Sequence, residues 1–79
     1  MVNDEASPAR AVLEEVLERA LDEAKQARRG GNVERLRAFV EVLSWGKIQA
    51  EVAGLGGFSN REIEAIDPES LLAPERRAA

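Results

Sequence analysis

The 79-residue chain contains no cysteine and no histidine. Without cysteine, neither disulfides nor cysteine-based zinc sites can form. Without cysteine or histidine, the few serines also lack the usual partner of a nucleophile–base pair. We therefore expect a protein that is not an enzyme and that holds no metal ion and no cofactor.

Aromatic side chains are scarce as well, at 4% of the residues, and no long apolar run is present. A membrane-spanning helix needs about 18 apolar residues in a row, and a secretory leader needs a basic start before an apolar stretch. The formal net charge of −4 argues against a surface that is basic throughout, as a general nucleic-acid or membrane footprint would be. These observations predict a cytoplasmic protein.

What the chain does contain is Ala, Glu, Leu and Arg, a composition that favours helices over sheets. A domain of this length buries only about 60–65% of the surface of its unfolded chain, so it is marginally stable alone. With disulfides and metals excluded, self-association is the stabilising device that remains. The composition predicts an all-α protein with one helical domain over residues 8–72, between a flexible N-terminus (1–7) and a disordered tail (73–79).

The first predicted helix covers residues 8–29. It starts at Ser7-Pro8, because serine accepts hydrogen bonds from free helical N–H groups and proline is tolerated at the first helical position. Apolar residues then recur at spacings of three and four: Val12, Leu13, Val16, Leu17, Ala20, Leu21, Ala24 and Ala27. Since the last of these are small, they would let another backbone approach closely.

A second predicted helix covers residues 32–54, after the break Gly30-Gly31-Asn32. Gly30 suits the left-handed conformation that ends a helix, and Asn32 is a good N-cap for the next one. Two helices joined by so short a loop must lie antiparallel, so we predict an αα-hairpin. Gly46, inside the second helix, marks a close helix contact, a bend or a tolerated exposed glycine.

The second helix has apolar residues on more than one side. At about 100° per residue, one side holds Val33, Leu36, Phe39, Val40, Leu43, Ala50 and Ala53. Another side holds Trp45, Ile48, Val52 and Leu55. A helix that is apolar most of the way round needs neighbours on two sides, and the chain is too short to supply them. We therefore predict that two hairpins form a dimeric, antiparallel four-helix bundle.

Short helices are predicted over residues 59–66 and 68–72. Ser59 and Glu62 have the spacing of a capping box, and Phe58 before them resembles the outer half of a hydrophobic staple. Asp67-Pro68 is a second cap followed by proline.

The residues Gly57-Phe58-Ser59-Asn60-Arg61-Glu62-Ile63 resemble the opening of the helix-turn-helix in LuxR-type response regulators, which commonly read Gly-Leu-Ser-Asn-Arg-Glu-Ile. In that family a turn and a recognition helix follow. Here residues 65–72 are acidic where the family presents polar and basic side chains, so the pattern departs where DNA would be read. A capping box explains the same residues, and we carry no function over.

Two charged clusters are candidate sites. Glu14, Glu18 and Asp22 lie four residues apart on one helix face, which we interpret as a solvated acidic face, with a metal site as the alternative. Basic residues gather at the hairpin tip, beside a helix N-terminus that favours anions. They are Lys25, Arg28, Arg29, Arg35 and Arg37. The arginines are a candidate anion or nucleic-acid site, although basic residues at a helix end are also expected from the helix dipole.

These patterns predict a non-catalytic helical module that self-associates and presents a helical surface to a protein partner. The candidate interface consists of Trp45, Ile48, Val52, Leu55 and Phe58. A lone tryptophan is usually part of the core or an interface anchor, and the angular position of Trp45 favours a contact outside the hairpin core. The alternative function is a nucleic-acid-associated regulator, a repressor or antitoxin accessory, that uses the basic tip.

Overall fold

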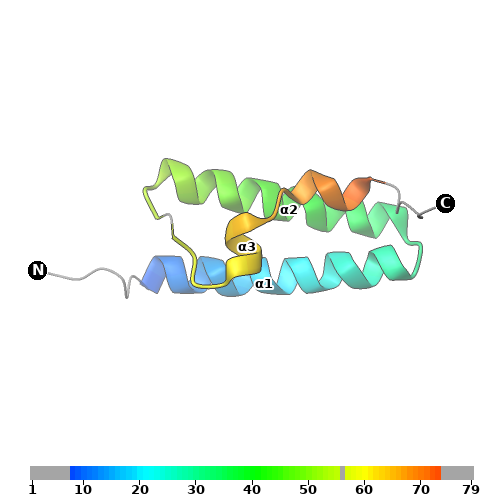
Figure 1. Cartoon of the computed structure of the whole chain (residues 1–79), viewed down its shortest axis with the longest axis horizontal. Coiled ribbons are helices and arrows are strands. Elements are labelled where there is room, and N and C mark those ends of the chain that lie inside the picture. Colours follow the sequence, from blue (N-terminus) through cyan, green and yellow to red (C-terminus); the bar gives the residue numbers. More distant parts are fainter. Residues whose placement is uncertain (1–7, 56, 74–79) are drawn as a thin grey trace, which may run out of the picture.

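The computed structural model describes residues 8–55 and 57–73. The elements in chain order are α1 (Pro8–Arg29), α2 (Val33–Val52), α3 (Arg61–Ala65) and a 3₁₀ helix, η2 (Pro68–Leu72). Helices α1 and α2 lie side by side and antiparallel, so the predicted hairpin is confirmed (Figure 1). The chain then returns across one face of the hairpin, with α3 against α1 and η2 mainly against α2. The predictions for residues 1–7 and 74–79 lie outside the described residues.

Both long helices end in the same glycine motif. After α1, the Asn32 N–H donates to the Ala27 carbonyl at 2.9 Å, and Gly31 takes a φ of +74°. After α2, the Leu55 N–H donates to the Ala50 carbonyl at 2.8 Å and Gly54 takes a φ of +72°. Each is a Schellman motif, which needs a left-handed residue one place beyond the helix cap. The left-handed residue of the first loop is thus Gly31, and the prediction of Gly30 was wrong.

The core lies between the two long helices and under the C-terminal segment. Its buried members are Leu17, Ala20, Leu21, Ala24, Ala27, Leu36, Val40, Leu43, Ala50, Phe58, Ile63 and Leu71. The predicted core side of α2 is therefore largely correct. It fails at the two ends of the helix, where Val33 and Ala53 are exposed.

Gly46 marks a close contact between the helices. A Cβ added there would lie 2.4 Å from Cδ2 of Leu17, which is fully buried. Atoms at that distance overlap, so only glycine leaves room for the leucine at this backbone spacing. Of the three interpretations of Gly46 left open by the sequence, the close helix contact is confirmed.

The short helix α3 begins later than predicted. Its N-cap is Asn60, whose side-chain oxygen accepts from the Ile63 N–H at 3.0 Å, and not Ser59. The physical reason is that Asn60 is itself anchored, because its own N–H donates to Glu14 on α1. Asp67 and Pro68 do begin η2 as predicted, with the Asp67 side chain accepting from Glu69 N–H at 3.3 Å.

Candidate interaction surface

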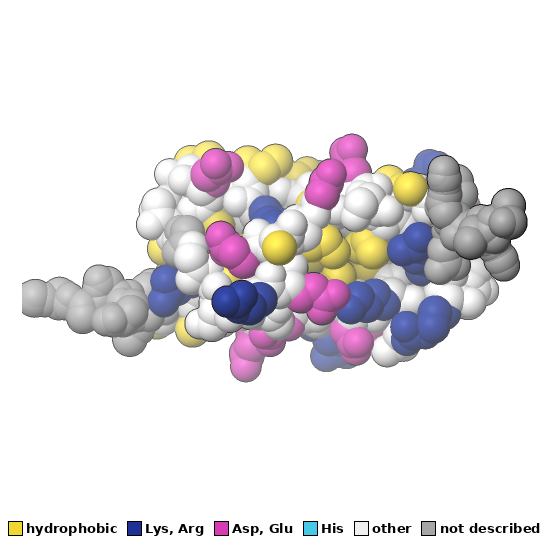
Figure 2. Space-filling view, in the orientation of Figure 1, with side chains coloured by type: hydrophobic (Ala, Val, Ile, Leu, Met, Phe, Trp, Pro, Cys, Tyr) yellow, Lys and Arg dark blue, Asp and Glu magenta, His cyan; other side chains and the backbone are white. Residues whose placement is uncertain are grey.

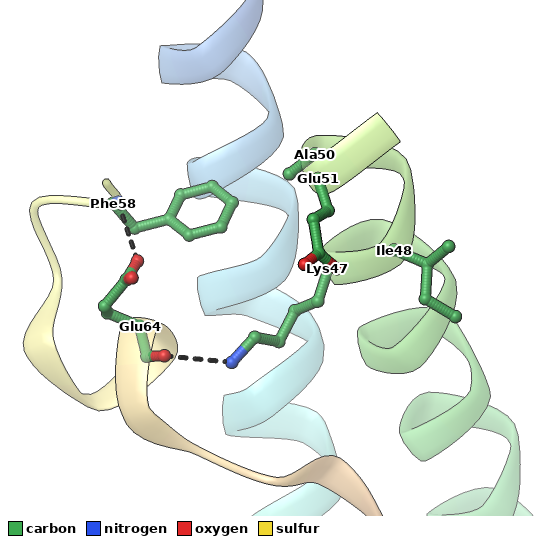
Figure 3. Close-up of a pocket in the computed structure, with 6 residues that line it drawn as sticks. All are labelled: Lys47, Ile48, Ala50, Glu51, Phe58 and Glu64. Carbon is green, nitrogen blue, oxygen red and sulfur yellow. Dashed lines mark hydrogen bonds between the residues drawn. The ribbon is translucent and has the colours of Figure 1, made fainter. Parts of the chain in front are cut away.

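Three apolar anchors hold the C-terminal segment, residues 57–73, on one face of the hairpin. Ile63 is fully buried, Leu71 is 7% exposed and Phe58 is 8% exposed. The Phe58 ring is directed between α1 and α2, whereas Ile48 points away on the far side of α2 (Figure 3). Phe58 was predicted to be an interface residue, and this is a correction: its apolar surface is covered within the chain. Leu55 is likewise half-buried against the core.

Carboxylates of α1 bind the beginning of α3. Glu14 accepts from the Asn60 backbone N–H at 2.5 Å, and Glu18 accepts from the Asn60 side-chain amide at 2.8 Å. Lys25 pairs with Glu62 at 2.5 Å. Glu18 and Asp22 are exposed, as expected for a solvated acidic face, but Glu14 and Glu18 also supply acceptors that a short helix needs for its N-terminal donors.

Lys47 of α2 binds the other end of α3. Its Nζ donates to the backbone carbonyls of Ile63 at 2.7 Å, Glu64 at 3.1 Å and Ile66 at 2.7 Å. An ammonium group has three donors and no acceptor, so these carbonyls satisfy it completely. Figure 3 shows the lysine reaching from α2 toward α3. This role of Lys47 was not predicted from the sequence. The one available signal was a single lysine within the most apolar half of α2.

Three large apolar side chains in the C-terminal half of α2 remain uncovered within the described residues. Trp45 is 61% exposed, Ile48 53% and Val52 76%. At about 100° per residue they fall within an arc of about 60°. We call these three residues the outer strip, because they lie on the side of α2 away from α1. On α1, Val12 and Val16 are also exposed, at 62% and 49%.

Two hollows flank the outer strip on the side of the C-terminal segment. The first, of about 340 Å³, lies between Ile48, Glu51 and Glu64 and has Phe58 in its wall. The second, of about 510 Å³, is lined by polar and apolar side chains of α2 and by η2. Its charged members are Glu34, Arg37, Glu41 and Glu69. Figure 2 shows acidic side chains spaced along the α2 side of this face, with apolar side chains at its upper edge.

The basic tip does not form one open cluster. Arg35 donates to Glu23 at 2.9 Å and stacks over the Phe39 ring at 5.1 Å. The hydrogen bond from Arg35, and a second one from Arg19, hold the pKa of Glu23 below its usual value of 4.5.

The other three arginines predicted at the tip have different surroundings. Arg28 donates to the Ala73 carbonyl at 3.2 Å, Arg37 lines the second hollow along α2, and Arg29 is exposed. The structure therefore places the four predicted anion-binding arginines in different surroundings.

The resemblance to a helix-turn-helix does not extend beyond the seven matching residues. In the described part of the segment, α3 has five residues and is followed by the 3₁₀ helix η2, with no recognition helix up to residue 73. Within residues 8–55 and 57–73, none of the helices combines the length and apolar character needed to cross a bilayer. Comparison of the chain with protein-family models, with curated proteins and with solved structures found no significant match.

Proposed function

We propose that the protein is a non-catalytic helical interaction module that acts in the cytoplasm and docks another helix on the outer strip. The observation that supports this proposal most strongly is the exposure of Trp45, Ile48 and Val52 together on one arc of α2. Isolated exposed apolar residues are ordinary, but a contiguous group with a tryptophan in it is typical of a binding surface.

The face of the hairpin on which the C-terminal segment lies, which we call the covered face, supports this proposal. The chain uses its C-terminal segment to bury Leu43 and Ile63 completely, so it has an element that covers apolar surface. That element stops short of the outer strip. Burying the strip would remove a tryptophan, an isoleucine and a valine from water, and each such side chain contributes about 1.5–3 kcal/mol when it is fully buried.

A second copy of the chain is one source of the docking helix, and it would form the four-helix bundle predicted from the sequence. Sedimentation or light scattering across concentration measures this directly. If the outer strip mediates self-association, Val52→Ala should lower the mass at a given concentration. Val33→Ala is the matched control, because Val33 is 57% exposed but lies at the other end of α2.

The outcome that would end the proposal is a chain that remains monomeric and binds no helical peptide while Trp45 stays exposed to solvent. The emission of the single tryptophan reports the last condition without interference, because the chain has no tyrosine.

The alternative, a nucleic-acid-associated regulator, is favoured only by the exposure of Arg29 and Arg37. It has less support because Arg35 is paired with Glu23 and Arg28 is bonded to Ala73. Nucleic-acid binding through phosphates weakens steeply with salt, so a labelled duplex at low salt is the appropriate test. No shift of the duplex there would reject this alternative.

A further inference from the structure

We infer that the helix bound by the outer strip is a basic amphipathic helix from another protein, with its lysines or arginines along one edge of its apolar face. This inference rests on the proposed function and names the chemistry of the partner. Its basis is the charge of the two hollows that flank the strip.

The hollows are lined by carboxylates from both α2 and the C-terminal segment. We call these residues the acidic rim: Glu34, Glu41, Glu51, Glu64 and Glu69. All five are exposed. By helical angle, Glu34 and Glu41 lie in line with the strip, toward the N-terminus of α2, and Glu51 lies on the flank of the strip where Glu64 also lines the first hollow. The opposite flank begins with Val42 and Gln49, which have no charge.

The cations near the rim do not balance it. Lys47 lies in the wall of the first hollow, but its ammonium group is already bonded to three carbonyls of the C-terminal segment. Arg37 is the other cation in the lining of the two hollows. A partner that brings positive charge to this flank would therefore meet complementary potential, which selects partners and speeds their encounter.

The same charges disfavour a second copy as the occupant. An antiparallel pair of strips related by a two-fold axis brings Glu51 and Glu64 of one copy to the same flank as Glu51 and Glu64 of the other. Glu34 and Glu41 of the two copies then lie at opposite ends of the contact. Like charges that meet across an interface are unfavourable. A basic helix has no such conflict.

The dimensions fit a helix of moderate length. From Glu34 to Glu51 the rim extends over about 25 Å of helix axis, which a partner of about 17 residues would match. The outer strip occupies the C-terminal two turns of α2, so the apolar anchors of the partner would lie at one end of the contact. Anchors spaced three, four and seven residues apart are the usual way a helix binds such a surface.

The test uses the full chain and a synthetic helical peptide of leucine and lysine, with the lysines along one edge of the leucine face. A second peptide has glutamate in place of every lysine. Binding is followed by the emission of Trp45, which should shift to the blue as the indole leaves water. We expect the lysine peptide to bind, its affinity to fall with added salt, and the glutamate peptide to bind much more weakly.

Variants locate the contact. Glu41→Gln and Glu51→Gln should each weaken binding of the lysine peptide by about 1.5- to 5-fold, the range for exposed ion pairs. Glu15→Gln is the matched control on α1 and should leave affinity unchanged. Val52→Ser should weaken binding about tenfold, since burial of a valine is lost, whereas Val33→Ser should not.

The possible failures are distinguishable. If the glutamate peptide binds as tightly as the lysine peptide, or if Trp45 is buried by self-association that the lysine peptide does not displace, the inference is overturned while the docking function stands. The inference is equally overturned if Glu15→Gln weakens binding as much as Glu51→Gln. If no peptide and no increase in concentration shifts the emission, the docking function fails as well.

Discussion

Two sides of α2 have similar apolar residues but differ in solvent exposure, since one side is buried and the other is exposed. On the inner side, facing α1 and the C-terminal segment, Leu43 is fully buried and Val40 is 4% exposed. On the outer strip, Trp45 and Val52 are 61% and 76% exposed. The difference is not one of hydrophobicity, because each side contains a valine and a larger apolar side chain. It lies in the polar groups that surround each side.

The covered face offers partners for the ends of a short helix. A helix of five residues has more unsatisfied terminal groups than residues, and it is unstable alone. Here Glu14 and Glu18 accept at one end through Asn60, while Lys47 donates to the carbonyls at the other. The outer strip has carboxylates near it but no comparable set of donors and acceptors for a segment of its own chain.

The largest effect on stability is expected when apolar side chains on the two sides of α2 are truncated to alanine. Leu43→Ala should lower the free energy of unfolding by about 2–5 kcal/mol, because it leaves a cavity in a fully buried site. Trp45→Ala should lower it by less than about 1 kcal/mol in the absence of a partner, since exposed side chains contribute little to folding. Urea denaturation measures both. Equal losses would mean that the indole is buried in solution and that the two sides do not differ.

A substitution of Lys47 tests whether its hydrogen bonds to the C-terminal segment hold that segment on the hairpin. Lys47→Met keeps much of the aliphatic stem and removes the ammonium group, so the carbonyls of Ile63, Glu64 and Ile66 lose their donor. We expect a loss of about 1–3 kcal/mol, as for hydrogen bonds to a charged group. Relative to the parent chain, amide hydrogen exchange in the variant should be accelerated more in α3 than in α1.

The control for that variant is Lys25→Met. Lys25 also joins α1 to the C-terminal segment, through an ion pair with Glu62, but both side chains are substantially exposed, at 38% and 53%. An exposed pair contributes about 0–1 kcal/mol. If Lys25→Met cost as much as Lys47→Met, the carbonyl contacts would have no special importance for the covered face.

The hairpin could be predicted from the sequence because its signals are local. Spacing of apolar residues, the Gly-Gly-Asn break and the caps at Asn32 and Asp67 all act within a few residues of chain. The position of the C-terminal segment could not be predicted in the same way. It depends on bonds such as Asn60 to Glu14, which join residues 46 positions apart.

The candidate interface was predicted in part for the same reason. Helical angles place Trp45, Ile48 and Val52 away from the core, and the structure exposes all three. Phe58 and Leu55 were grouped with them because nothing in the sequence shows that the chain folds back over the hairpin. The acidic rim was missed, since it combines carboxylates of α2 with those of a segment whose position was unknown.

Gly46 tests the spacing of α1 and α2 on which the covered face depends. Gly46→Ala gains about 1 kcal/mol in helix propensity, but its Cβ would overlap Leu17, and overpacking typically costs about 1–3 kcal/mol. We expect a net loss of about 1 kcal/mol. In a Leu17→Ala background the same substitution should become favourable, because the overlapping atoms are gone.

Gly30→Ala is the control for that cycle. A Cβ at Gly30 meets its nearest atom, the Gln26 carbonyl oxygen, at 3.5 Å, which is ordinary contact. The change should therefore alter stability by no more than about 0.5 kcal/mol. A loss at Gly46 that persisted without the Leu17 side chain would show that helix spacing is not set by this pair.

The smallest test concerns the side of the hairpin that the C-terminal segment leaves open near the tip, where Glu23 of α1 joins Arg35 of α2. Since the hydrogen bonds from Arg35 and then Arg19 lower the pKa of Glu23, the folded chain favours the ionised carboxyl. The stabilisation is therefore complete above the unfolded value of about 4.5 and is lost as pH falls through the lowered folded value.

Glu23→Gln removes this pH-dependent stabilisation. The variant should have a lower free energy of unfolding than the parent chain near neutral pH, and the difference should shrink as the pH falls below about 4.5. Glu15→Gln, at an exposed position of α1, is the control for removing a carboxylate from that helix. A difference for Glu23→Gln that grew on acidification would mean that the pKa is raised, and that the open side of the hairpin is held by contacts other than this ion pair.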